Sequence, residues 1–416
     1  MESIFIQIAS YRDPELIPTI KNLLTRATHP ERLKICIAHQ FSKEDLWDTL
    51  SEFEGDSRFI VIEIPYAESQ GACWARFQIQ QHYNNEDYTL QLDSHHRFVP
   101  GWDTECIAML KELQKKGSPK PLITSYLPSY VPSEHPSDNN PMPATFLNKP
   151  VYGMALNEWM DGVALFHPYT APTSKEPVKS RFYSGHFAFT VGSFAKEVMH
   201  DPMMYFHGEE ISLSVRAYTH GYDLYMPHKT LAWHEYTRQG RTKHWSDHDK
   251  WIDIDIASKS RVRQLLGVNG EVCTPCNKNT FKNFDVGLER SIKDYEVYAG
   301  VDFKTQKTTV KCQQNLSPPG NSWEIYINKR NDYKVTLHKA DFEEIDYSFA
   351  VLLFEDNKGE IVYQDYITKK EIESLVNGNN SYLILNKIST CDTPHRYVVW
   401  PYSKSRSWGI KLITYF

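Results

Sequence analysis

The stretch Ile4-Phe5-Ile6-Gln7-Ile8-Ala9-Ser10-Tyr11-Arg12-Asp13-Pro14 encodes a β-α unit. Its apolar first half predicts a buried strand, and Asp13-Pro14 suits the N-cap and first position of an amphipathic helix that runs to about Arg26. The alternation continues, with strands expected over 33–38, 59–64 and 88–92 and helices over 42–53 and 71–83. This order predicts an α/β fold with a mostly parallel, Rossmann-like sheet.

Polar triplets follow two strands of this predicted sheet. Ser10-Tyr11-Arg12 comes after the first strand, and Asp93-Ser94-His95 comes after the fourth. Ligands of parallel sheets bind beyond the carboxyl ends of the strands, so these triplets are candidates for a binding site. The sequence contains neither a GxGxxG nor a Walker motif, which disfavours a dinucleotide dehydrogenase and a P-loop enzyme.

Composition excludes several classes of protein. The 416 residues carry a formal net charge of −6, which argues against a nucleic-acid binder that works by neutralising phosphates. No window approaches the roughly 18 apolar residues of a membrane-spanning helix. We therefore expect a cytoplasmic protein without a transmembrane segment, while peripheral membrane association stays open. The seven cysteines do not resemble a disulfide scaffold, and Cys273-Thr274-Pro275-Cys276 is interpreted as structural rather than as a redox or zinc motif.

The character of the sequence changes along the chain. Residues 128–150 contain six prolines and predict a long loop of the kind that forms lids or acceptor-binding segments. A strand is expected over 183–191, a helix over 209–220 and a linker over 315–321. Short aromatic and β-branched segments then predict a β-sandwich-like unit, with strands over 323–327, 333–337, 347–354, 382–385, 396–400 and 410–416 and a helix over 369–376. We expect two domains, over residues 1–300 and 315–416.

A metal site is the first chemical hypothesis. Residues i and i+2 of an extended segment project to the same side, so Asp93 and His95 can hold one ion. An oxygen and a nitrogen ligand suit Mn²⁺ or a similar divalent ion. His234 is the favoured third ligand among His186, His207, His228, His234 and His244, because Arg238 and Arg241 follow it and could hold a diphosphate. The alternative is that Asp93 caps a turn and that His234 is a surface residue beside a packed tryptophan.

Several motifs follow one another in a recognisable order: the segments 4–16, 18–20, 29–33, 71–76, 91–95 and 101–103, with Phe98. They resemble the motifs of the N-acetylglucosaminyltransferases related to the enzyme that glycosylates hydroxyproline on Skp1. The resemblance spans about residues 3 to 260, and the last 100 or so residues lie outside it. It implies a GT-A glycosyltransferase domain, a UDP-sugar donor, a divalent cation (Mn²⁺ or Mg²⁺) and retention of anomeric configuration.

The resemblance also implies roles for individual residues. Asp93, His95 and, as the third ligand, His234 are expected to hold the metal, since the first two match a DxH motif that polypeptide GalNAc-transferases also use. Tyr11 is expected to stack on uracil. The remaining donor-binding residues are expected to be Ser10 and Arg12 at the base, Arg76, Ser94, Arg238 and Arg241 near the diphosphate, and Gly185 and His186 under the sugar.

Glu209 and Glu210 are the candidate catalytic residues. They lie in a segment, Phe206-His207-Gly208-Glu209-Glu210, that resembles the acidic motif beneath the family's active site. One carboxylate can bind sugar hydroxyls while the other orients the acceptor or supports an oxocarbenium-like transition state. The alternative is structural, because acidic side chains are favourable in the first turn of a helix. The sequence leaves open which glutamate is essential.

The sequence is compatible with three functions. The first is a retaining transferase that moves GlcNAc from UDP-GlcNAc to a hydroxyl of a protein or glycan acceptor. The second keeps the enzyme but uses UDP-GlcNAc or another UDP-sugar to build a capsule, lipopolysaccharide or other surface polysaccharide. The third is an inactive carbohydrate-binding or scaffold protein, against which the intact Asp-x-His and Glu-Glu patterns argue.

Overall fold

An eight-stranded mixed sheet forms the centre of the larger part of the molecule. The computed structural model describes residues 2–132, 151–171, 173–238, 240–270, 281–309, 312, 325–326, 331–342, 346–389 and 394–416. The strand order is β3-β2-β1-β4-β10-β6-β11-β9. The first four of these strands are mutually parallel: β1 (Ile4–Tyr11), β2 (Leu33–Phe41), β3 (Phe59–Pro65) and β4 (Tyr88–Asp93).

The other half of the sheet mixes directions. β10 (Phe187–Val191) runs antiparallel to both β4 and β6 (Pro121–Thr124). β11 (Asp223–Met226) is parallel to β6, and β9 (Val178–Lys179) closes this edge in antiparallel orientation. The expected α/β class with its largely parallel sheet is therefore confirmed.

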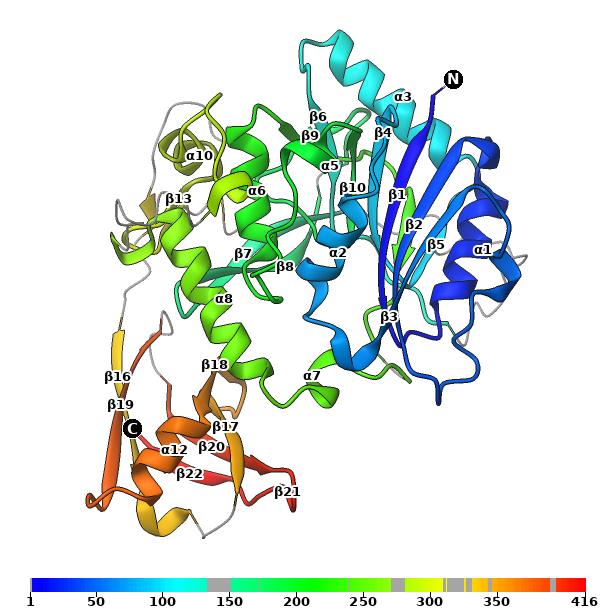
Figure 1. The fold of residues 1–416 in the computed structure, drawn as a ribbon. Coiled ribbons are helices and arrows are strands. Elements are labelled where there is room, and N and C mark those ends of the chain that lie inside the picture. The colour runs from blue at the N-terminus through cyan, green and yellow to red at the C-terminus, as the bar shows by residue number, and fades with distance from the viewer. Residues whose placement is uncertain are drawn as a thin grey trace.

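Helices cover both faces of the sheet. Alternate side chains of β1 point to opposite faces, as the period of a strand requires. Ile6 packs toward α1 (Leu16–Arg26) and α3 (Trp102–Lys115), whereas Phe5 packs toward α2 (Ala72–Gln80). Figure 1 shows α1 and α2 on opposite sides of the parallel strands.

Two sequence predictions in this part differ from the structure. The helix expected over 42–53 is wrong, because only the short 3₁₀ turn Ser51–Phe53 forms there. Leu46 and Trp47 are exposed, so a helix over these residues would not bury its apolar side chains. The strand expected over 183–191 begins only at Phe187, and the residues before it pass beside the pocket described below.

Further elements surround the open end of the sheet. β5 (His96–Phe98) pairs with β12 (Ala232–His234), and β7 (Tyr152–Met160) forms a hairpin with β8 (Val163–Thr170). These pairings were not foreseen. The helices are α5 (Phe194–Glu197), α6 (Glu209–Thr219), α7 (His244–Asp247), α8 (Trp251–Leu266) and α10 (Ile292–Ala299), and β13 (Val301–Asp302), β14 (Lys307–Thr309) and β15 (Ile325–Tyr326) form a small sheet.

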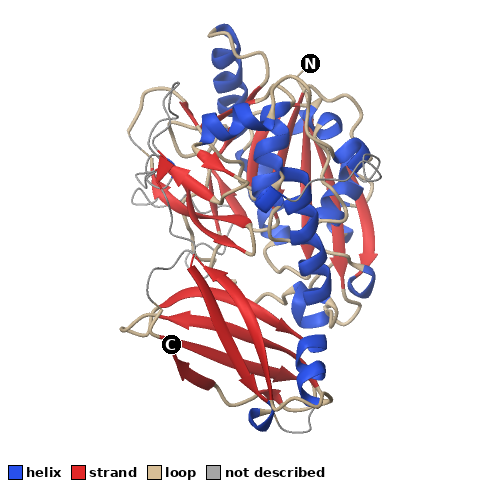
Figure 2. Cartoon of the chain, turned by 90° about the vertical axis from the view of Figure 1, so that its left-hand side faces the viewer, coloured by secondary structure: helices blue, strands red, loops and turns tan. Residues whose placement is uncertain are grey.

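The C-terminal part is built from two antiparallel sheets. β16 (Asn331–His338) pairs with β19 (Tyr382–Ser389). The second sheet contains β17 (Tyr347–Glu355), β18 (Ile361–Thr368), β20 (Arg396–Ser403), β21 (Ser407–Trp408) and β22 (Leu412–Tyr415). Figure 2 shows these strands crossing below the helices of the larger part. Apart from β18 and β21, which the sequence did not reveal, the strands of these two sheets and α12 (Lys369–Val376) lie where the pattern predicted them. The strand expected over 323–327 as part of this unit corresponds to β15, which pairs with β14 instead.

None of the helices within the described ranges is both long and apolar enough to cross a membrane. The expected linker over 315–321, the Cys273/Cys276 motif and residues 133–150 of the proline-rich loop lie outside the described residues.

Candidate active site

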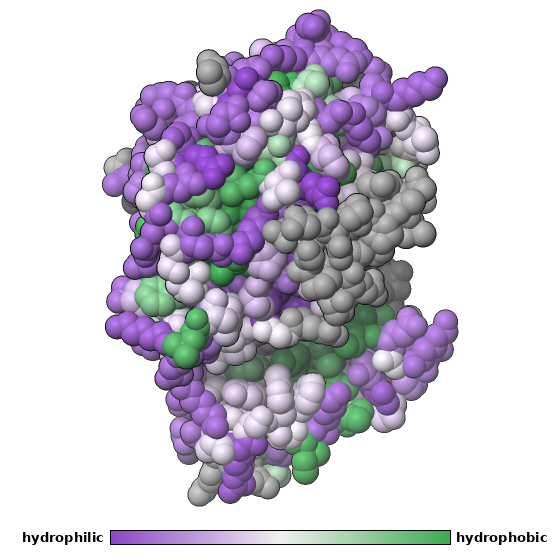
Figure 3. All heavy atoms as spheres, turned by 90° about the vertical axis from the view of Figure 1, so that its right-hand side faces the viewer, coloured by the Kyte–Doolittle hydropathy of each residue, from purple (hydrophilic) through white to green (hydrophobic). Residues whose placement is uncertain are grey.

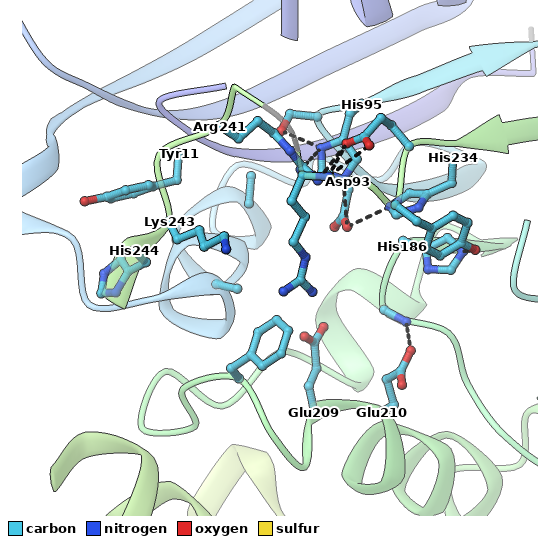
Figure 4. Close-up of a pocket in the computed structure, with 18 of the residues that line it drawn as sticks. Tyr11, Asp93, His95, His186, Glu209, Glu210, His234, Arg241, Lys243 and His244 are labelled. Atoms are coloured by element: carbon cyan, nitrogen blue, oxygen red, sulfur yellow. Dashed lines mark hydrogen bonds and ion pairs between the residues drawn. The ribbon is translucent and has the colours of Figure 1, made fainter. Parts of the chain in front are cut away.

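A pocket of about 960 Å³ opens at the carboxyl ends of β1 and β4. Side chains from distant segments line it, including Tyr11, Asp93, His95 and Glu210 (Figure 4). Arg76 of α2 lines it as well. The pocket therefore lies where ligands of α/β sheets bind, as the two polar triplets predicted.

Asp93, His95 and His234 converge in this pocket. The ligating atoms of the three side chains all lie within 4.8 Å of one another. Asp93 Oδ2 is 3.3 Å from His234 Nε2 and 3.6 Å from His95 Nε2. His234 reaches the cluster because β12 pairs with β5, directly after the Asp93-Ser94-His95 turn. A carboxylate and two imidazoles form a donor set that fits Mn²⁺ or a similar divalent ion.

A second carboxylate orients one of these imidazoles. Asp13 Oδ2 lies 2.7 Å from His95 Nδ1 and accepts a hydrogen bond from the Ser94 hydroxyl at 2.6 Å. A carboxylate oxygen can only accept, so Nδ1 carries the proton that Asp13 binds and Nε2 keeps its lone pair. One guanidinium nitrogen of Arg241 also lies over this ring, 2.6 Å from Nδ1 and 2.9 Å from Nε2. Metal-binding histidines are commonly held in this way by a carboxylate behind the ring. Asp13, which the sequence suggested only as a helix cap, therefore belongs to the site.

Burial keeps the neighbouring imidazoles neutral. It lowers the pKa of both His234 and His186 well below the usual range. His186 does not present its Nε2 to the cluster, because this atom accepts a hydrogen bond from the Leu127 amide at 3.1 Å. Its ring instead stacks on His234 with centroids 4.3 Å apart. His186 thus positions His234, whereas His234 has the neutral form that metal binding requires.

Glu209 and Glu210 have different surroundings although they are adjacent in sequence. Glu209 forms an ion pair with Arg76 and lies 2.9 Å from His200 Nε2. Burial opposes its ionisation, but Arg76 and His200 outweigh this and lower its pKa. Arg76 also contacts Asp93 at 2.5 Å, so Glu209 anchors the arginine that borders the metal cluster.

The pKa of Glu210 is shifted in the opposite direction to that of Glu209. Burial raises its pKa to about 7. It accepts hydrogen bonds from the Gly185 amide at 2.9 Å and the Tyr126 hydroxyl at 2.8 Å. It also lines the pocket, so it can hydrogen-bond a ligand in either protonation state. Tyr126 and His200 were not identified from the sequence, because no local pattern links them to the glutamates.

Two glycines allow the starts of α2 and α6 to pack closely against neighbouring side chains. Gly71 precedes α2, which carries Arg76, and has φ +107; a Cβ there would lie 2.6 Å from Tyr205 Cδ2. Gly208 precedes α6, which carries both glutamates, and has φ +97; a Cβ there would lie 2.5 Å from Val262 Cγ2. A side chain at either position would shift the charged residues that follow it.

The segment around α7 closes one side of the pocket. Tyr11 donates a hydrogen bond to Asp247 at 2.7 Å, and its ring lies 5.0 Å from that of His244. Arg12 pairs with Asp45 and with the same Asp247 carboxylate. Tyr11 therefore lines the pocket as expected.

The sequence-predicted donor residues divide into two groups. Ser10 is buried in β1 and Arg12 is held by its two aspartates, and neither of them lines the pocket. The structure thus does not bring these two residues into the cluster. The pocket lining also includes Gln40, Tyr205, Tyr236, Lys243 and Trp245, which the sequence did not indicate. The other predicted site residues all line the pocket: Tyr11, Arg76, Asp93, Ser94, His95, Gly185, His186, Glu209, Glu210, His234, Arg238 and Arg241.

The chain is similar to known glycosyltransferases in sequence and in fold. A profile of the family described as "Glycosyltransferase (GlcNAc)" matches residues 3–58 and 49–305. A crystal structure of GalNAc-T7 with UDP, GalNAc and Mn²⁺ is similar over 100% of this chain and 79% of that chain, with a TM-score of 0.51 and 12% identity. S. aureus TarS 1–349 in complex with UDP-GlcNAc aligns with 63% of this chain and 70% of that chain, with a TM-score of 0.36 and 10% identity.

The likeness to GalNAc-T7 concerns the fold alone, which is the GT-A architecture. A search of curated protein sequences gives no significant match.

Proposed function

Since the chain belongs to the glycosyltransferase (GlcNAc) family, we propose that it transfers GlcNAc from UDP-GlcNAc to an acceptor hydroxyl with retention of anomeric configuration. The observation that carries the proposal is the convergence of Asp93, His95 and His234 beside Glu210 in one pocket. GalNAc-T7, which has the same architecture, was crystallised with UDP, GalNAc and Mn²⁺, and this supports a UDP-sugar donor and a divalent cation.

Asp93, His95 and His234 are the residues that would hold the cation. Mn²⁺ is the ion we propose, with Mg²⁺ as the alternative. When bound there, the ion supplies a Lewis acid that neutralises the diphosphate of the donor. Asp13 keeps the lone pair of His95 Nε2 directed at the cluster, and Arg76 lies on the far side of Asp93.

The cationic side chains of the pocket would bind the donor. Arg241 lies 2.8 Å from Glu235 and contacts His95, so it is positioned next to the proposed diphosphate site. Arg238 and Lys243 extend the positive charge along the same segment. Tyr11 and His244 provide aromatic faces at the other end of the pocket, where we place the uracil ring.

Glu210 would act on the sugar side of the pocket. We propose that it accepts a hydrogen bond from a hydroxyl of the donor sugar or of the acceptor. The bond between the donor's anomeric carbon and the diphosphate oxygen breaks while the acceptor oxygen bonds to that carbon on the same face. The acceptor's proton passes to the departing diphosphate oxygen. Glu209 takes no part in these bonds and keeps Arg76 in place.

The organisation of the chain fits this proposal. We assign the transferase to residues 1–300 and a separate domain to 315–416. The division is supported by the sheets, since β1–β12 and β16–β22 share no strand, whereas β15 pairs with β14 across the proposed boundary. The sequence motifs that resemble N-acetylglucosaminyltransferases related to the enzyme acting on Skp1 are the support for the GlcNAc donor and for the retained configuration. This resemblance covers none of the C-terminal domain and therefore does not indicate the acceptor.

Release of UDP from UDP-GlcNAc, measured with and without Mn²⁺, tests the proposed function. We expect release that stops when the metal is chelated and that is lost in Asp93→Asn. Asp253→Asn, which alters an exposed carboxylate on α8, is the matched control and keeps full activity. Equal turnover in chelated enzyme, or in Asp93→Asn, would contradict the proposal.

A further inference from the structure

The sheet of β17, β18, β20, β21 and β22 has two different faces. On one face, Leu352 and Val399 pack inside the C-terminal part against β16. On the other, Phe349 and Val398 pack on Trp251, at the start of α8. This second face extends beyond the contact with the larger part, so a portion of it stays exposed. Its exposed side chains are Trp408 at 42%, Ile413 at 49% and Tyr415 at 61%.

Four aromatic rings gather where this face becomes exposed. Trp408 is in contact with Trp400, Tyr402 and Phe349, with ring centroids 4.3, 5.1 and 5.7 Å away. We call these four residues the aromatic platform. Figure 3 shows hydrophobic side chains along the recess between the upper and lower parts of the molecule, the region in which the two parts meet.

The hairpin that carries Trp408 is fixed by hydrogen bonds. Trp400 Nε1 donates to the Gly409 carbonyl at 3.0 Å, and the Gly409 amide donates to the Pro401 carbonyl at 2.8 Å. At the tip of the hairpin, Ser405 donates to Asp346 at 2.7 Å. The exposed ring is therefore held in place before any ligand arrives, which lowers the entropic cost of binding.

One cation, Lys411, lies against the platform. Residues 396–416 contain four lysines and arginines and no aspartate or glutamate. The Lys411 ammonium lies 4.3 Å from the centre of the Trp400 ring. Lys404 pairs with Asp249 of the larger part, and Arg396 pairs with Glu355. Lys411 is thus the cation that directly adjoins the rings.

Aromatic rings connect the platform with the pocket. Phe349 of the platform lies 5.8 Å from Trp251, and Trp251 lies 6.3 Å from Trp245. Trp245 lines the pocket. The Lys404–Asp249 ion pair joins the hairpin to the residues that follow α7, the helix whose Asp247 contacts Tyr11. Phe349 and Trp251 are buried, so their rings pack inside the contact between the two parts, whereas the Lys404–Asp249 pair is exposed. A ligand bound on the platform therefore lies on the surface next to α7, which carries Trp245.

We propose that the aromatic platform binds an acidic glycan and presents it to the pocket as the acceptor. The apolar face of a pyranose ring stacks on an indole, and lysines attract carboxylates along such a polymer. An uncharged hydrophobic partner would not use the Lys411 ammonium beside the rings. The inference rests on the proposed function, because it names the substrate of that same site.

Binding of polygalacturonate and hyaluronate to the full chain tests the platform, with dextran as a neutral glycan and poly-L-glutamate as an acidic polypeptide. We expect both acidic glycans to retard the protein in affinity electrophoresis, and Trp408→Ala to weaken this binding about tenfold, as loss of an exposed aromatic anchor does. Lys411→Ala should weaken it less. Tyr382→Ala, which removes an equally exposed ring from β19, is the matched control and leaves binding unchanged.

Three outcomes would overturn the inference: no binding of either acidic glycan, equal weakening by Tyr382→Ala, or tighter binding of poly-L-glutamate. Lys411→Glu provides a second test if Trp408→Ala does not fold, because it should reduce binding without removing a packed ring. UDP-GlcNAc hydrolysis should be unchanged in all platform variants. Absence of hydrolysis in the wild type would instead overturn the proposed function, and the polymer measurements would still decide the platform separately.

Discussion

Charged side chains are paired with one another in the pocket, whereas the platform exposes one aromatic side chain, that of Trp408. Arg76, Asp93 and Glu209 form a connected set of ion pairs inside the larger part. Trp408 presents its ring to solvent on a short hairpin of the C-terminal part. Buried charge is costly unless it is paired, so removal of one member of the first set should affect both chemistry and stability. An exposed ring can be removed at little cost to either.

Asp93→Asn should give the largest difference between the pocket and the platform. Asp93→Asn should lower UDP-GlcNAc turnover by about 10³-fold, because the cluster loses its only carboxylate and the charge that attracts the cation. Binding of polygalacturonate should not change. Steady-state UDP release and affinity electrophoresis on the same preparation measure both effects. A parallel loss of polymer binding would show that the pocket and the platform are not separate sites.

Glu210 and Glu209 provide the second test, within the pocket itself. Glu210→Gln should reduce kcat by about 10²-fold with a small change in melting temperature, as for a group that acts in the transition state. Glu209→Gln should destabilise the fold by about 3–5 kcal/mol, because Arg76 loses a buried partner. Kinetics and urea unfolding of the two matched variants separate these roles. The reverse pattern would exchange the assignments of the two glutamates.

Asp13 should have a smaller effect. Asp13→Asn keeps the size of the side chain but removes the carboxylate behind His95, and we expect a loss of about 10- to 100-fold in Mn²⁺ affinity. Titration of Mn²⁺ into the protein, followed by its electron paramagnetic resonance signal, measures this. Saturating Mn²⁺ should restore most of the activity. Failure of added metal to restore it would mean that Asp13 supports the fold rather than the metal site.

The pH dependence of stability should show the smallest effect. The pKa of Glu210 is raised to about 7, so the folded protein holds this proton more tightly than the unfolded chain. This contribution is complete below the ordinary pKa of about 4.5 and is lost as the pH rises through 7, at a total of at most about 3 kcal/mol. The free energy of unfolding between pH 5 and 8 should therefore fall less steeply in Glu210→Gln. Identical slopes in both proteins would contradict the assigned pKa.

The sequence was most informative where a residue's environment is set locally. The strands β1, β2 and β4 could be predicted because each is an apolar run largely buried on both faces of the sheet. The edge strand β3 is less buried and was found from its β-branched residues. The Asp-x-His spacing was enough to find two members of the cluster, and the arginines that follow His234 suggested the third.

The rest depends on contacts between distant segments. Asp13 has the sequence of a helix cap, and only the fold places it against His95, 82 positions away. Glu209 and Glu210 are chemically identical in the sequence and differ because Arg76 reaches one and the Gly185 amide the other. Arg12 matched the family motif, yet Asp45 and Asp247 hold it away from the pocket.

Calorimetric titration of UDP into the protein tests the central claim most directly. With Mn²⁺ present, we predict saturable binding at one site, which disappears when Mn²⁺ is chelated and in His95→Ala and His234→Ala. UDP binding of equal affinity with and without the metal, or in the histidine variants, would contradict a cation held by Asp93, His95 and His234.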